Sequence, residues 1–128
     1  MFDADALLRQ WQVEYKVPGD IIWGGYEELG GSAKVGYTMG LCRYTKYLDA
    51  ANVWTGRSTI FLDTGMRRAP DFFKTCVLWH ELSHANAYNE DLENDAHNAH
   101  FRAYRRRKKL YWIGDMLAKL LSPIWCKS

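Results

Sequence analysis

One segment, Cys76–Asn86, constrains this chain more than any other because it contains the pattern His-Glu-x-x-His. On an α-helix, residues four apart lie on the same face, so His80 and His84 can present two imidazole nitrogens to one metal ion. Glu81 lies one step further round the helix, beside the metal, where its carboxylate can take a proton from a metal-bound water. This arrangement is typical of zinc hydrolases.

The neighbours of this pattern favour a helix that is mostly buried. Pro70-Asp71 is a typical helix start, and the flanking apolar residues are Val77, Leu78, Leu82 and Ala85. Two His and one Glu at these offsets arise by chance in on the order of one chain in a few hundred of this length. A surface helix with two unrelated histidines is therefore the weaker interpretation.

The composition is that of one globular domain, residues 1–128, with a hydrophobic share of 48%. The net charge of +2 implies no partner by itself. No apolar run has the length of a membrane span, and residues 1–5 resemble no secretory signal. The sequence predicts no particular oligomeric state.

The three cysteines, Cys42, Cys76 and Cys126, are odd in number, far apart and without Cys-x-x-Cys spacing. This usage indicates free thiols in a reducing compartment and excludes a zinc ribbon. We therefore expect a cytoplasmic protein.

The first half of the chain predicts one helix followed by strands. Asp3 or Asp5 can cap the helix, whose apolar face contains Leu7, Leu8, Trp11 and Tyr15. The apolar runs and period-two alternation predict three strands, near Ile21–Trp23, Val35–Arg43 and Thr59–Asp63.

The last third predicts helical structure after a polar loop at residues 89–95. A second long helix opens at Ala96 and reaches Tyr111 or beyond. Further apolar residues, ending near Pro123, form an amphipathic face of Ile113, Leu117, Leu120, Leu121 and Ile124. We interpret this face as core, and the alternative of a membrane surface is weaker because Lys119 is the only cation opposite.

A catalytic zinc ion needs a third protein ligand and one open position. The downstream candidates are Glu90, Glu93, Asp95, His97 and His100. His97 and His100 are three apart, so on a helix both lie near one face, and this spacing alone does not choose between them.

The run from His80 to Ala85, followed by His97 and by Phe101 four residues later, resembles the SprT-like zinc metalloproteases. The resemblance covers roughly residues 3 to 110. It implies an α+β, zincin-like fold: an N-terminal helix, a small mainly antiparallel sheet, the His-Glu-x-x-His helix and a C-terminal helix that supplies the third ligand.

Carried over by position, the resemblance makes His80, His84 and His97 the Zn²⁺ ligands and Glu81 the general base. The family's third histidine is usually followed by Gly, whereas Asn98 follows His97 here, and His100 is therefore the alternative ligand. Without a cysteine-rich ribbon, the chain would be a minimal catalytic unit.

The implied activity is hydrolysis of peptide bonds in protein substrates by a zinc-bound water that Glu81 activates. Candidate donors to the oxyanion are Tyr88 and Tyr104. Thr59–Leu62 is the candidate edge strand for substrate pairing. The alternative class is a zinc-stabilised, non-catalytic module that binds protein or nucleic acid, against which the retained Glu81 counts.

A basic cluster follows the two downstream histidines. It consists of Arg102, Arg105, Arg106, Arg107, Lys108 and Lys109. Clustered cations with aromatic neighbours are a footprint of nucleic-acid binding, so DNA is a candidate partner, while a solvated helix face is the more ordinary interpretation.

Overall fold

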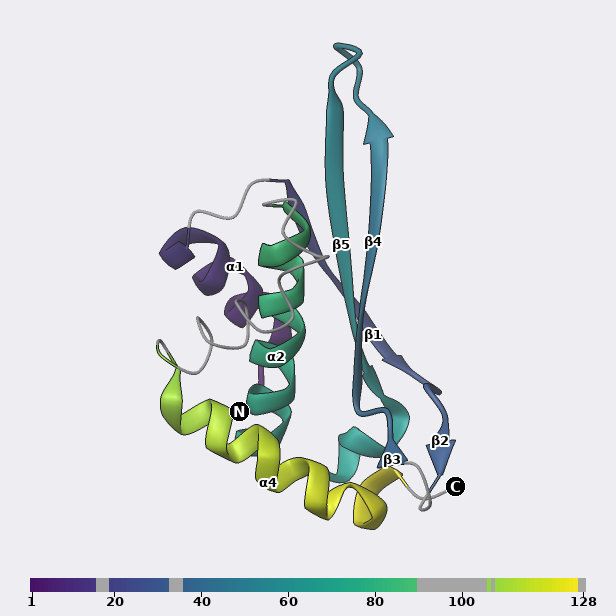
Figure 1. The fold of residues 1–128 in the computed structure, drawn as a ribbon, viewed down its shortest axis with the longest axis vertical. Helices are drawn as coiled ribbons and strands as arrows, with labels where there is room; N and C mark the ends of the chain where they lie inside the picture. Colours follow the sequence, from purple (N-terminus) through teal and green to yellow (C-terminus); the bar gives the residue numbers. More distant parts are fainter. Residues whose placement is uncertain (16–18, 33–35, 90–105, 107, 127–128) are drawn as a thin grey trace.

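A computed structural model provides the fold (Figure 1) and describes residues 1–15, 19–32, 36–89, 106 and 108–126. Its elements, in chain order, are α1 (Ala4–Tyr15), β1 (Asp20–Glu27), β2 (Gly31–Ser32), β3 (Gly36–Tyr37), β4 (Gly40–Leu48), β5 (Trp54–Asp63), the 3₁₀ turn η1 (Thr64–Arg68), α2 (Asp71–Asn89) and α4 (Lys109–Cys126). The architecture is a mixed α and β one, in agreement with the α+β expectation.

The main sheet has the strand order β1-β5-β4. β4 and β5 pair antiparallel, as adjacent strands joined by a short turn do, whereas β1 pairs with β5 in parallel. β5 is the central strand, and its Ile60 and Leu62 side chains are fully buried. The expectation that Thr59–Leu62 forms an exposed edge is therefore wrong: β4 and β1 flank β5 on its two sides.

The first helix begins and packs as the sequence predicts. The Asp3 carboxylate accepts a hydrogen bond from the backbone N–H of Ala6, at 3.1 Å, and this contact satisfies one of the free N–H groups of the first turn. Leu8 and Trp11 are buried. The Trp11 ring lies 4.9 Å from the ring of Trp79 on α2, so α1 covers one side of the motif helix.

The motif helix α2 begins at Asp71, directly after Pro70, as expected. It lies between α1, the sheet and α4 (Figure 1). Burial of Val77, Leu78 and Leu82 follows from this position. The His-Glu-x-x-His pattern thus lies on a helix that other elements cover on several sides.

The orientation of α4 is opposite to the one expected. Its buried residues are the small or C-terminal ones, Gly114, Ala118, Ser122 and Trp125. Most of the face interpreted as core is exposed: Ile113, Leu117, Leu120 and Ile124. The physical reason is close packing on α2, because a Cβ at Gly114 would overlap the Cys76 sulfur and the Phe72 ring.

The helix also continues past Pro123 to Cys126, so the expected end near Pro123 is wrong. Two contacts hold the last turn. The Trp125 side chain is buried in the core, and the Arg68 guanidinium donates to the Trp125 carbonyl oxygen at 2.6 Å. η1 therefore fastens the C-terminal end of α4.

The hairpin of β4 and β5 projects well beyond the rest of the molecule (Figure 1). The two strands stay paired out to Leu48 and Trp54, whereas β1 accompanies β5 only from Arg57 onward. At the base of the projection, Tyr47 donates to the Asp20 carboxylate at 2.8 Å. The sheet is therefore three-stranded beside the helices and two-stranded at its far end.

Two further expectations concern chemistry rather than topology. Cys42, Cys76 and Cys126 are all thiols outside any disulfide, as predicted. Among the residues that the structure describes, none of the helices combines the length and the apolar character needed to span a bilayer.

Candidate metal centre

The motif brings two imidazoles together on one face of α2. His80 Nε2 and His84 Nε2 lie 3.3 Å apart. Two nitrogens that bind the same zinc ion, at the usual bond length and at the tetrahedral angle, lie about 3.3 Å apart. The pair therefore has the separation that a shared zinc ion requires, and Glu81 completes a group whose ligand atoms lie within 4.8 Å of one another.

His80 is oriented by a residue from the far end of the chain. Its Nδ1 lies 2.8 Å from Oδ2 of Asp115 on α4. In the neutral imidazole, a carboxylate at this distance favours the tautomer with the proton on Nδ1, so that the Nε2 lone pair faces His84. Sequence reasoning missed Asp115, since nothing local to it marks it among the apolar residues of α4.

Glu81 is nearly enclosed, with 8% of its surface exposed. Strand β4 covers it: a Cβ at Gly40 would lie 2.8 Å from Glu81 Cγ, so only glycine allows this approach. Burial raises the pKa of the Glu81 carboxyl to about 7, an effect that His80 opposes and Asp115 reinforces. A carboxyl with such a pKa can both accept and release a proton near neutral pH.

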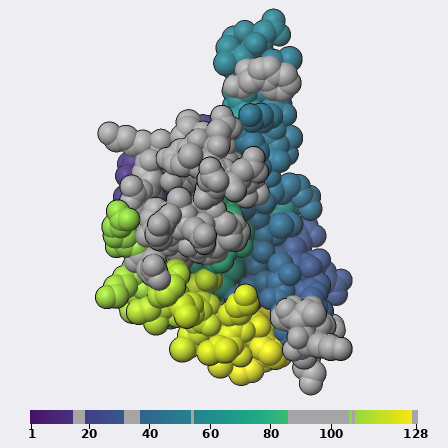
Figure 2. All heavy atoms as spheres, viewed as in Figure 1, coloured from purple at the N-terminus to yellow at the C-terminus, as the bar shows by residue number. Residues whose placement is uncertain are grey.

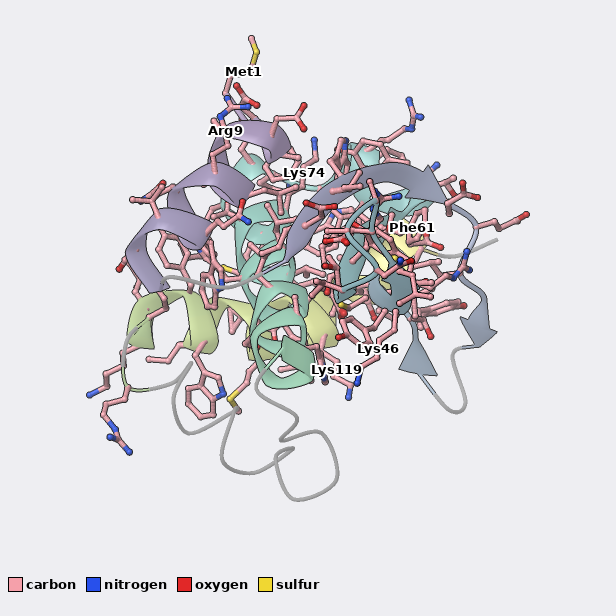
Figure 3. The ribbon with its side chains drawn as sticks, turned by 90° about the horizontal axis from the view of Figure 1, so that it is seen from above. Met1, Arg9, Lys46, Phe61, Lys74 and Lys119 are labelled. Carbon is pink, nitrogen blue, oxygen red and sulfur yellow. The ribbon has the colours of Figure 1, made fainter. Side chains whose placement is uncertain are left out.

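His80 and Glu81 line a cavity of about 280 Å³. Its lining residues come from the β3–β4 segment, α2 and α4, and are Tyr37, Thr38, Met39, Gly40, Val77, His80, Glu81, Asp115 and Lys119. Lys119, labelled in Figure 3, gives this cavity a cation beside the two carboxylates. Sequence reasoning had used Lys119 only as a surface charge.

Several candidate site residues lie outside the described part of the chain. They are His97, His100, Arg102, Tyr104, Arg105 and Arg107, and the side chain of Tyr88 is likewise not described.

The described members of the basic cluster differ from one another. Arg106 and Lys109 are exposed, whereas Lys108 Nζ lies 3.3 Å from Glu14 Oε2 and 4.9 Å from the centre of the Trp79 ring. Lys108 therefore contacts both α1 and α2 and contributes to their packing.

Comparisons with known protein families, with curated proteins and with solved structures find no match to this chain.

The contact from Asp115 predicts a measurable effect on metal binding. We expect Asp115→Asn to weaken zinc binding by about 10–100-fold, because outer carboxylates that orient a ligating histidine contribute on this scale. Competition with a chromophoric chelator measures the affinity. Met116→Gln, at the exposed neighbouring position, is the control and should bind zinc as the parent does. Equal affinity in Asp115→Asn and the parent would contradict an orienting role.

The raised pKa of Glu81 predicts a pH-dependent stability in metal-free protein. Between pH 4.5 and about 7 the unfolded chain has released this proton and the folded chain retains it, so the free energy of unfolding falls as pH rises. His80 acts in the same direction, because its pKa is also raised: desolvation lowers it, but the Asp115 carboxylate outweighs that effect.

Comparison with Glu81→Gln isolates the contribution of Glu81. Above pH 8 we expect the glutamine variant to be more stable than the parent by about 3 kcal/mol, and at pH 4.5 the two should be nearly equal. Urea unfolding with chelator present measures both. A difference that stays constant with pH would mean that Glu81 is solvated in the folded state.

Proposed function

We propose that this chain is a zinc-dependent metallopeptidase that hydrolyses peptide bonds in protein substrates. The observation that carries the proposal is the pair of His80 and His84 Nε2 atoms, 3.3 Å apart, with Glu81 in the same group of ligand atoms. Glu81 and His80 also line the cavity. The contact between His80 Nδ1 and Asp115 Oδ2 adds support, because a carboxylate in this position orients a metal-binding imidazole.

His80 and His84 would hold the zinc ion through their Nε2 atoms. When bound, zinc supplies a Lewis acid that polarises a carbonyl group and makes water more acidic. Asp115 holds His80 in the required tautomer and ring orientation. The buried carboxylate of Glu81 accepts the proton of the attacking water at Oε and delivers it to the leaving amine nitrogen.

The substrate backbone is best accommodated along β4. β4 flanks β5 on the side away from β1, and at Gly40 it passes directly over Glu81. An extended peptide that pairs with this strand gains main-chain hydrogen bonds and runs through the cavity. β4 thus takes the role that the sequence had suggested for Thr59–Leu62.

The third ligand belongs to the same proposal. Among the described residues, the metal-ligating group contains only His80, Glu81 and His84, and Asp115 is engaged with His80 Nδ1. His97, by its resemblance to the SprT-like pattern, is the proposed third ligand, with His100 as the alternative. The free thiols accord with a cytoplasmic location, since disulfides are rare there.

The test is metal content together with proteolysis. We expect the purified chain to hold one zinc ion and to cleave unfolded casein. Chelation should abolish cleavage, and added zinc should restore it. A chain with neither zinc nor cleavage would refute the proposal. Zinc without cleavage would instead identify the non-catalytic binding module.

DNA is a separate candidate partner of the same enzyme. It is motivated by the exposed Arg106 and Lys109 and is tested by adding single-stranded DNA to the casein assay. Phosphate contacts would be supported if the effect of DNA on the rate of casein cleavage declines with salt. The effect should decline further in the double variant Arg106→Ala and Lys109→Ala.

A further inference from the structure

The outer face of α4 carries an apolar stripe that no described element covers. The stripe consists of Leu110, Ile113, Leu117, Leu120 and Ile124, which are between 47% and 79% exposed. α4 forms the lower edge of the molecule in Figure 2, with the described helices and strands on its other side. These five positions contain no polar residue.

The spacing of the stripe is three, four, three and four residues. This is the a/d repeat of a helix that packs against another helix, and it keeps one seam in line over the length of α4. The membrane alternative needs a cationic border along the apolar face. Lys109 is the one lysine or arginine of α4 that borders the stripe, since Lys119 lines the metal cavity.

The exposed apolar area of this face is large for a monomer. Met116 and Phe72, 52% and 40% exposed, extend the stripe on either side. Together the seven side chains offer on the order of 600 Å² of apolar surface, at the upper end of what ordinary monomers display. Two copies would bury about 1,200 Å², which reaches the lower limit of stable protein interfaces.

We propose that α4 is a homodimer interface, formed by the stripe of one copy packing against the stripe of a second copy about a two-fold axis. An uncharged stripe is complementary to itself, as an isologous interface requires. Asp115 and Lys119 lie on the opposite side of the helix, at the cavity, so dimerisation leaves both metal centres open. The proposal does not depend on the peptidase activity.

Sedimentation equilibrium of the full chain tests the proposal. We expect a dissociation constant on the order of 10–100 μM, since an interface of this size and hydrophobicity is weak. Leu120→Glu should weaken the dimer at least about tenfold, because it places a charge in the middle of the seam. Leu120 is 79% exposed in the monomer, so folding should be retained, as circular dichroism can verify.

Val13→Glu is the matched control, because Val13 on α1 is also 79% exposed and lies apart from the stripe. It should dimerise as the parent does. The proposal is overturned if the parent is still monomeric at concentrations several times above about 100 μM, or if the two glutamate variants associate equally. The dimer proposal would also be overturned, in favour of a lipid surface, if the monomer binds phosphatidylserine vesicles and Leu120→Glu abolishes this binding.

Discussion

Glu81→Gln is expected to lower peptide hydrolysis by about a thousandfold while zinc stays bound. Glutamine keeps the size and the packing of Glu81 against Gly40 but cannot accept a proton. General acid–base groups contribute about 10²–10⁴-fold to rates, and Glu81 would act twice in each turnover. The measurements are zinc content and casein cleavage of the variant beside the parent.

Two outcomes would contradict this assignment. Equal turnover by variant and parent would remove Glu81 from the mechanism. Loss of zinc together with activity would make Glu81 a ligand, which its place in the group of ligand atoms within 4.8 Å would then explain. Glu28→Gln, at a residue outside the cavity that His80 and Glu81 line, is the control for a charge change of the same kind and should cleave normally.

His97→Ala is expected to yield metal-poor, inactive protein, whereas His100→Ala should still bind zinc. The chain has four histidines. Two of them, His80 and His84, already belong to the candidate metal centre, so His97 and His100 are the two that remain as a third ligand. On a helix, His97 lies directly above Phe101, and His100 is rotated from Phe101 by about 100°. We expect a Phe101 ring that packs between helices to direct His97 toward His80 and His84.

The loss of zinc affinity in each of the two variants distinguishes a zinc ligand from a residue that only lies beside the site. Loss of a ligand should collapse zinc affinity, as in His84→Ala, which serves as the reference variant. Loss of an outer partner costs only about 10–100-fold. Zinc titration of all three variants makes the comparison, and a metal-poor His100→Ala beside a zinc-replete His97→Ala would shift the ligand by three residues.

The parts of the site that could be predicted are those that one helix determines alone. His80, Glu81 and His84 come together because a helix fixes the positions of residues four apart. Asp115 meets His80 across 35 residues, and only the packing of α4 on α2 brings them into contact. No local pattern encodes that distance, so the carboxylate partner was missed.

The orientation of α4 shows why hydropathy alone misleads. Its large apolar residues, such as Leu120 and Ile124, suggest a core face, yet Gly114 and Ala118 are the residues that pack inward. Small side chains allow two helices to approach closely, and that distance decides which face is buried. The parallel pairing of β1 with β5 was hidden for a related reason, since it joins strands separated by the whole of β4.

The projecting hairpin gives one pair of strands two very different stabilities. Near the candidate metal centre, Ile60 and Leu62 of β5 are enclosed by β1, β4 and α2, so their amide protons should exchange with deuterium only when the whole domain unfolds. Near Leu48, which is half exposed, the strands can separate without disturbing the core, and exchange should be faster by orders of magnitude. Because β4 is one continuous strand, this difference forms a gradient of protection along it. The slowly exchanging end is the one that covers Glu81.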